Sequence, residues 1–109
     1  MTATWLYVTA GSRDEAVSIG HLLVEERLAA CANVLPGTTA IYWWEGKVEE
    51  GAEAVLVLKT RADLVDAATA RIRSVHSYSC PCVAALPVAG GNPDFLDWIV
   101  NETRQPTEE

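Results

Sequence analysis

The residues best suited to chemistry lie in one stretch, His76-Ser77-Tyr78-Ser79-Cys80-Pro81-Cys82. Cys80 and Cys82 are two positions apart, so on an extended segment their side chains face the same way. Thiolates and an imidazole are suitable ligands for Cu(I) or Zn. We therefore predict a metal site formed by His76, Cys80 and Cys82, with copper or another divalent metal ion as the cofactor. The alternative is that both cysteines act as small apolar side chains at the start of a strand.

The rest of the chain offers no catalytic constellation. The second histidine, His21, lies beside Leu22 on a predicted helix, where a surface histidine is the ordinary interpretation. Gly90-Gly91 is not followed by the Lys and Ser or Thr of a phosphate-binding loop. Only a reactive thiol at Cys80 or Cys82 would suggest covalent catalysis. We therefore predict that the protein is not an enzyme.

The amino-acid composition limits which binding partners and which cellular compartment we expect for this protein. The chain has 109 residues, which predicts a single domain over residues 1–109, and half of them are apolar. Its net charge of −7 argues against binding the phosphate backbone of nucleic acids. No apolar run approaches the roughly 20 residues of a membrane span, and no secretion signal precedes the first strand. Three cysteines are an odd number for a disulfide framework, so we expect a reduced, cytoplasmic protein.

The first half of the chain predicts a strand, a helix and a long hairpin. Residues 5–9 favour a strand, and Ser12 and Glu15 form a capping box for the helix that follows. Residues 31–44 favour a strand that bulges at Pro36-Gly37. Glu45-Gly46-Lys47 and residues 49–51 are typical of turns, and residues 52–60 complete a hairpin.

The second half predicts a helix, a strand and a final helix. Thr60 is the predicted cap of the second helix, and residues 83–86 favour a fourth strand. Asn92-Pro93 is a favourable start for the last helix. Its predicted buried side is formed by Phe95, Leu96, Ile99 and Val100. The order β-α-β-β-α-β-α predicts an α+β fold, a ferredoxin-like βαββαβ sandwich with an extra C-terminal helix. Both long helices should cover one face of a four-stranded antiparallel sheet.

An aromatic cluster, Tyr42-Trp43-Trp44, lies on the predicted hairpin. Alternation places Tyr42 and Trp44 on one face and Trp43 on the other. At least one ring must therefore pack outside the helix-covered core, most simply on another subunit. The alternative is packing at the rim of the same chain.

Several blocks in order resemble the CutA family of divalent-cation tolerance proteins. They are residues 31–37 (CANVLPG), 41–49 (IYWWEGKVE), 58–60 (LKT), 75–78 (VHSY), 85–88 (ALPV) and 91–98. The resemblance extends over roughly residues 5–103. It implies a PII-like trimer whose long bent hairpins pair between subunits, a link to copper tolerance, and binding of divalent metals. The family brings no established enzymatic activity.

The resemblance also assigns individual positions. The family's histidine corresponds to His76, its motif tyrosine to Tyr78 and its motif cysteine to Cys31. This chain departs from the family at two positions, since Ser77 replaces a common Pro and Cys82 a common Glu. A copper-binding cysteine of some bacterial relatives is absent, because Val8 occupies its position. If a metal binds at Cys82, the thiol favours softer ions.

A second interpretation is a PII-like small-molecule sensor or scaffold. By analogy with trimers that place ligands in clefts between subunits, the side chains of Tyr42, Trp44, Lys59 and Tyr78 could line such a cleft.

Overall fold

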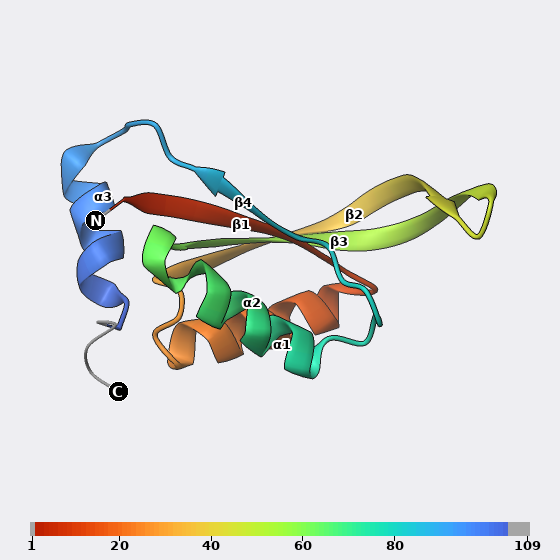
Figure 1. Ribbon diagram of the computed structural model, residues 1–109, viewed down its shortest axis with the longest axis horizontal. Helices are drawn as coiled ribbons and strands as arrows, with labels where there is room; N and C mark the ends of the chain where they lie inside the picture. Colours follow the sequence, from red (N-terminus) through yellow and green to blue (C-terminus); the bar gives the residue numbers. More distant parts are fainter. Residues whose placement is uncertain (1, 105–109) are drawn as a thin grey trace.

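The computed structural model describes residues 2–104, and its elements follow the predicted order. The four strands form one sheet in the order β2-β3-β1-β4, with every neighbouring pair antiparallel. Helices α1 and α2 lie side by side on one face of this sheet, and α3 lies at its end (Figure 1). The α+β architecture confirms the predicted fold. The elements are β1 (Ala3–Ala10), α1 (Arg13–Glu25), β2 (Cys31–Trp44), β3 (Lys47–Arg61), a 3-10 turn η1 (Ala62–Leu64), α2 (Val65–Val75), β4 (Val83–Pro87) and α3 (Pro93–Glu102).

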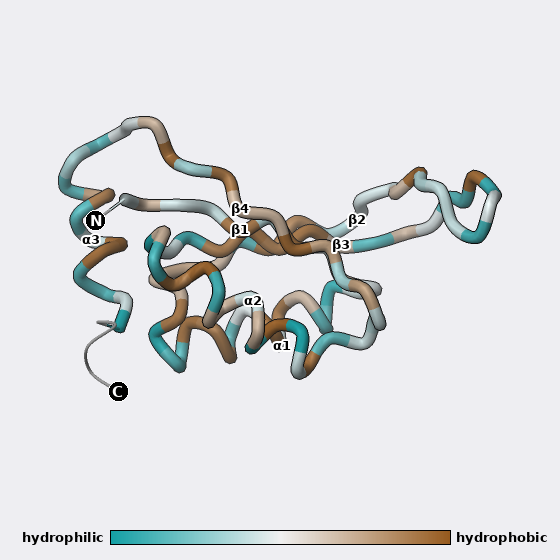
Figure 2. The backbone as a smooth tube through the Cα atoms, viewed as in Figure 1, coloured by the Kyte–Doolittle hydropathy of each residue, from teal (hydrophilic) through white to brown (hydrophobic). Residues whose placement is uncertain are grey.

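The core lies between the sheet and the two helices. Leu6 and Val8 of β1 and Leu56 and Leu58 of β3 are fully buried there. Apolar side chains on one face of α1 and of α2 supply the opposite side, where hydrophobic residues gather in Figure 2. At Gly20 of α1 a Cβ atom would meet the Ala32 Cβ at 3.2 Å and the Leu56 Cδ1 at 3.3 Å. A residue without a side chain therefore lets α1 approach the sheet closely.

Helix α1 begins as predicted, but only half of its capping box forms. The Ser12 hydroxyl accepts a hydrogen bond from the Glu15 N–H at 3.1 Å. The Glu15 carboxylate does not return to Ser12. It accepts instead from the Gly11 N–H and from Ser77, sixty-two positions further along the chain. The Glu15 side chain of the predicted capping box therefore also binds a loop that is distant in the sequence.

The β2–β3 hairpin is longer than predicted. Its pairing runs from Cys31 and Lys59 to Trp44 and Lys47, with an irregularity between Leu35 and Thr38, as predicted for Pro36-Gly37. The prediction that residues 49–51 form a turn was wrong, because β3 starts at Lys47. Positive φ angles at Glu45 (51°) and Gly46 (80°) make a two-residue turn, so no further residues are needed to reverse the chain. The hairpin therefore extends well beyond the rest of the sheet (Figure 1).

Two other predictions about local structure need correction. Thr60 does not cap the second helix, because it continues β3 as the partner of Thr4. Its buried hydroxyl donates to the Leu28 carbonyl at 2.7 Å, and η1 intervenes before α2. The Asn92 cap of α3 is confirmed, yet of the predicted buried side only Ile99 is fully buried. Helix α3 packs at the end of the sheet, where Ile99 contacts Ala3 and Ala30. The rest of its predicted buried side lies outside this contact, and Phe95 stays 40% exposed.

Candidate functional site

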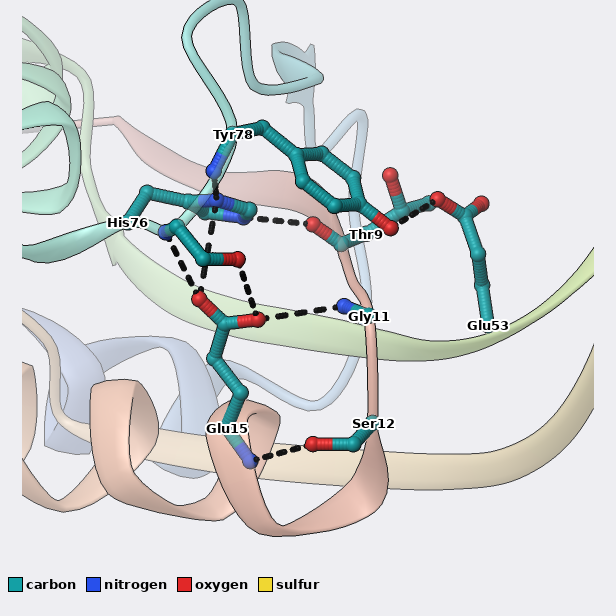
Figure 3. Close-up of polar contacts among 8 residues, drawn as sticks. Thr9, Gly11, Ser12, Glu15, Glu53, His76 and Tyr78 are labelled. Carbon is teal, nitrogen blue, oxygen red and sulfur yellow. Dashed lines mark hydrogen bonds and ion pairs between the residues drawn. The ribbon is translucent and has the colours of Figure 1, made fainter.

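His76 follows α2 and its side chain is fully buried. Its Nδ1 accepts a hydrogen bond from the Tyr78 N–H at 3.0 Å, and its Nε2 lies 2.8 Å from the Thr9 carbonyl oxygen (Figure 3). Because Nδ1 accepts, the proton of the neutral ring belongs on Nε2, which donates to Thr9. Both ring nitrogens therefore hold backbone groups of β1 and of the loop that follows α2.

The Glu15 carboxylate joins the same loop to the first turn of α1. It accepts hydrogen bonds from the Ser77 N–H at 2.8 Å, the Ser77 hydroxyl at 2.9 Å and the Gly11 N–H at 3.2 Å. Burial by itself raises the pKa of the Glu15 carboxyl, but these hydrogen bonds outweigh it and leave that pKa below its ordinary value. The carboxylate is therefore held in its charged form.

Tyr78 links the loop to the hairpin. Its hydroxyl donates to the Glu53 carboxylate of β3 at 2.8 Å, and its ring lies 4.8 Å from that of His76. Burial and the hydrogen bond to the Glu53 carboxylate raise the pKa of Tyr78 to about 12. We call the set Glu15, Glu53, His76, Ser77 and Tyr78 the loop clasp, because it ties residues 76–78 to three separate elements.

A hollow of about 570 Å³ lies between the hairpin and residues 78–82. Its aromatic side chains come from β2 (Tyr42 and Trp44) and from the loop (Tyr78). Cys80 and Cys82 also line it, and both are exposed free thiols. We call it the aromatic hollow; its lining is Thr9, Ala40, Tyr42, Trp44, Glu53, Tyr78, Ser79, Cys80 and Cys82.

The structure brings together two of the three predicted metal ligands. Cys80 and Cys82 share the aromatic hollow, whereas His76 is not part of its lining. Over residues 2–104, no three His, Cys, Asp or Glu side chains are grouped closely enough to hold a metal ion. To ligate a metal, His76 would have to give up one of its two hydrogen bonds. The three-ligand site therefore stays a prediction.

The four side chains suggested for a small-molecule cleft divide in the same way. Tyr42, Trp44 and Tyr78 line the aromatic hollow, but Lys59 does not. Its ammonium group lies over the Trp5 ring at 5.3 Å, on another part of the sheet. Sequence reasoning also missed Glu53, which it placed only within the second strand of the hairpin, residues 52–60. No local signal identifies it, since its partner Tyr78 is twenty-five positions away.

The third cysteine, Cys31, does not line the aromatic hollow. Cys31 is half-buried and pairs with Lys59 at the start of β2. Burial raises the pKa of its thiol, with the Lys59 charge acting in the opposite direction. Cys31 is therefore a natural internal control for the chemistry of Cys80 and Cys82.

Large apolar side chains remain exposed on the hairpin and on the sheet face opposite α1 and α2. On the hairpin, Trp43 is 75% exposed and Ile41 is 69% exposed. Trp5 and Tyr7 alternate with the buried residues of β1, and Leu86 of β4 pairs with Trp5; all three are about two-fifths exposed or more. Within the part of the chain that the structure covers, no helix is both long and apolar enough to cross a membrane.

Comparison with known proteins places these observations in a family. Residues 4–102 match the family described as CutA1 divalent ion tolerance protein. The rice protein CutA 1, chloroplastic (Oryza sativa subsp. japonica), is 43% identical over 100 residues, which are 92% of this chain and 56% of that protein. The divalent-cation tolerance protein CutA of Thermus thermophilus is 43% identical over 96 residues, 88% of this chain and 93% of that protein.

The fold comparison agrees with the sequence comparison. The crystal structure of CutA1 from Oryza sativa matches with a TM-score of 0.93 and 41% identity, covering 96% of each chain. The chain spans about half the length of the first plant and animal relatives that it matches, but nearly the whole of the Thermus protein. Since the match includes β1 through α3 at this level of identity, the chain belongs to the CutA1 divalent ion tolerance protein family.

Proposed function

We propose that the protein acts in the cytoplasm as a homotrimer that binds metal ions, copper among them, and thereby contributes to cation tolerance. The observation that carries the metal-binding role is the common exposure of Cys80 and Cys82 in one hollow. Two thiols that face one space can chelate an ion without refolding the chain. The role is one of binding rather than catalysis.

The proposal that the protein is a homotrimer rests on the surface that the single chain leaves uncovered. Strand β2 is an edge of the sheet, and its outer half carries Ile41, Tyr42, Trp43 and Trp44, all exposed. Exposed edges that carry large apolar side chains are ordinarily covered by another chain. The resemblance to CutA proteins suggests three copies, with the hairpins pairing between subunits.

Metal titration combined with a mass measurement tests this function. The reduced protein should sediment as three chains of 11.8 kDa, about 35 kDa in total, and should bind Cu(I) and Zn(II) more tightly than Mg(II). Replacing Cys80 or Cys82 should abolish that preference. Replacing His76 tests its predicted place as the third ligand, because unchanged metal binding by the folded variant would exclude direct ligation. Equal, weak binding of all three ions would contradict the proposed metal function.

A second candidate function is small-molecule sensing in the aromatic hollow. The observation that favours it is the meeting of Tyr42, Trp44 and Tyr78 around one space. Aromatic walls with a few polar groups are typical of ligand sites. A rise in melting temperature with nucleotides, and none with metal ions, would support this function over metal binding.

A further inference from the structure

We propose that Cys80 and Cys82 form a two-thiolate site selective for soft monovalent cations, Cu(I) and Ag(I), over divalent ions. This inference rests on the proposed metal-binding function and deepens it by naming the class of ion and reducing the ligand set to two.

The donors in the hollow set the class of ion. Among residues 2–104, Cys80 and Cys82 are its only thiols, and Glu53 is its only carboxylate. Glu53 already accepts the Tyr78 hydroxyl, and residues 2–104 bring no third His, Cys, Asp or Glu into a metal-holding group with the cysteines. Zn(II) is almost always four-coordinate, and hard divalent ions require several oxygen ligands. Monovalent d¹⁰ ions, by contrast, accept two thiolates in a line.

The loop clasp and the sheet hold both sides of the Cys80–Cys82 segment. On one side, Tyr78 is fixed through His76 and Glu53. On the other side, Val83 pairs with Val8 of β1 directly after Cys82. Pro81 restricts the backbone between the two thiols. The segment is therefore largely ordered before an ion arrives, which lowers the entropic cost of chelation.

The surroundings of the two thiols attract a cation. Tyr42, Trp44 and Tyr78 offer aromatic rings, whose faces attract cations. No lysine or arginine lines the hollow among the residues described, and the chain carries a net charge of −7. When the ion binds, both thiols release their protons to solvent, and two sulfur–metal bonds form. A monovalent ion then leaves a single negative charge at the site, with no change in oxidation state.

Titration with Ag(I), which does not change its oxidation state, tests the proposal. The reduced, anaerobic protein is titrated in the presence of a millimolar monothiol competitor, with native mass spectrometry and tryptophan fluorescence as readouts. We expect one Ag(I) per chain and quenching of Trp44. Cys80→Ser and Cys82→Ser should each weaken binding by about 100-fold or more, because chelation by the second thiol is lost. Cys31→Ser is the matched control and should bind as the unmodified chain does.

Two further experiments distinguish the selectivity for Ag(I) from the proposed metal-binding function. Trp44→Phe should keep the stoichiometry but lose the fluorescence change, which places the ion in the hollow. Competition with Zn(II) should not displace Ag(I). Tight Zn(II) binding with weak Ag(I) binding would overturn the selectivity while leaving the metal-binding function intact. Ag(I) binding that survives both serine variants would overturn the two-thiolate site, and the absence of binding by any metal would overturn both proposals.

Discussion

At the scale of single residues, the structure gives His76 a positioning role. Its ring is fully buried, and its nitrogens contact the Thr9 carbonyl and the Tyr78 N–H. A histidine that satisfies two partly buried backbone groups is costly to replace, since each would lose its partner. His76, one of the three metal ligands predicted from the sequence, thus holds the loop that presents the two thiols.

Replacing Glu15 tests the loop clasp through its pH dependence. Glu15→Gln should lower the free energy of unfolding at pH 7 by about 1–2 kcal/mol, because charge-assisted hydrogen bonds to Ser77 and Gly11 weaken. The pKa of Glu15 is depressed in the folded state, so its contribution is present above the ordinary carboxyl pKa of 4.5 and is lost as the pH falls through the lower folded value. Urea unfolding at pH 7 and pH 3.5 measures both effects.

The difference in unfolding free energy between the unmodified chain and Glu15→Gln should therefore be smaller at pH 3.5 than at pH 7. Glu25→Gln, an exposed change on the same helix, is the control and should leave stability unchanged at both values. A difference that stays constant with pH would show that the Glu15 charge is not what holds the loop.

The contribution of Tyr78 to stability should change at alkaline pH. Its pKa of about 12 in the folded protein lies above the ordinary value near 10, so its contribution is complete below pH 10 and declines as the pH rises towards 12. Tyr78→Phe should cost about 0.5–1.5 kcal/mol at pH 8, since the hydrogen bond to Glu53 is removed. That cost should diminish at pH 11. Denaturant unfolding at the two pH values checks it, and a cost that grows with pH would contradict this assignment.

At the scale of elements, the close approach of α1 to the sheet depends on Gly20. Gly20→Leu should destabilise the protein by about 1–3 kcal/mol, because even its Cβ meets Ala32 and Leu56 within 3.3 Å. Gly90→Ala is the matched control: nothing lies within 4 Å of its added Cβ, so the effect should stay within about 0.5 kcal/mol. Thermal and urea unfolding measure both. Equal effects of the two substitutions would show that α1 can shift away from the sheet without loss.

The hairpin shows how an element acquires two different surfaces. With a two-residue turn at Glu45-Gly46, alternate side chains of β2 face opposite sides. Tyr42 and Trp44 line the aromatic hollow, whereas Trp43 does not. The predicted alternation is therefore confirmed, and it separates two residues of the candidate ligand site from Trp43, which stays exposed in the single chain.

At the scale of the whole molecule, the proposed homotrimer makes Trp43 an interface residue. Trp43→Glu should reduce the mass from about 35 kDa to the 11.8 kDa of one chain, because a charge would be buried between subunits. The fold should survive, since Trp43 is 75% exposed in the single chain. Sedimentation and circular dichroism measure the two outcomes. Arg73→Glu, an exposed change on α2, is the control, and an unchanged mass for Trp43→Glu would exclude this residue from the interface.

The sequence by itself determined the element order, the capped starts of α1 and α3, and the bulge at Pro36-Gly37. Each of these follows from local rules: side-chain periodicity, capping by Ser12 and Asn92, and the backbone preferences of proline and glycine. Tertiary structure decided that Thr60 extends a strand, that Glu15 and Glu53 hold the loop, and that Cys80 and Cys82 line the aromatic hollow whereas His76 does not. Those outcomes depend on contacts between residues 25 to 67 positions apart, which only strand pairing and the packing of helices on the sheet bring together.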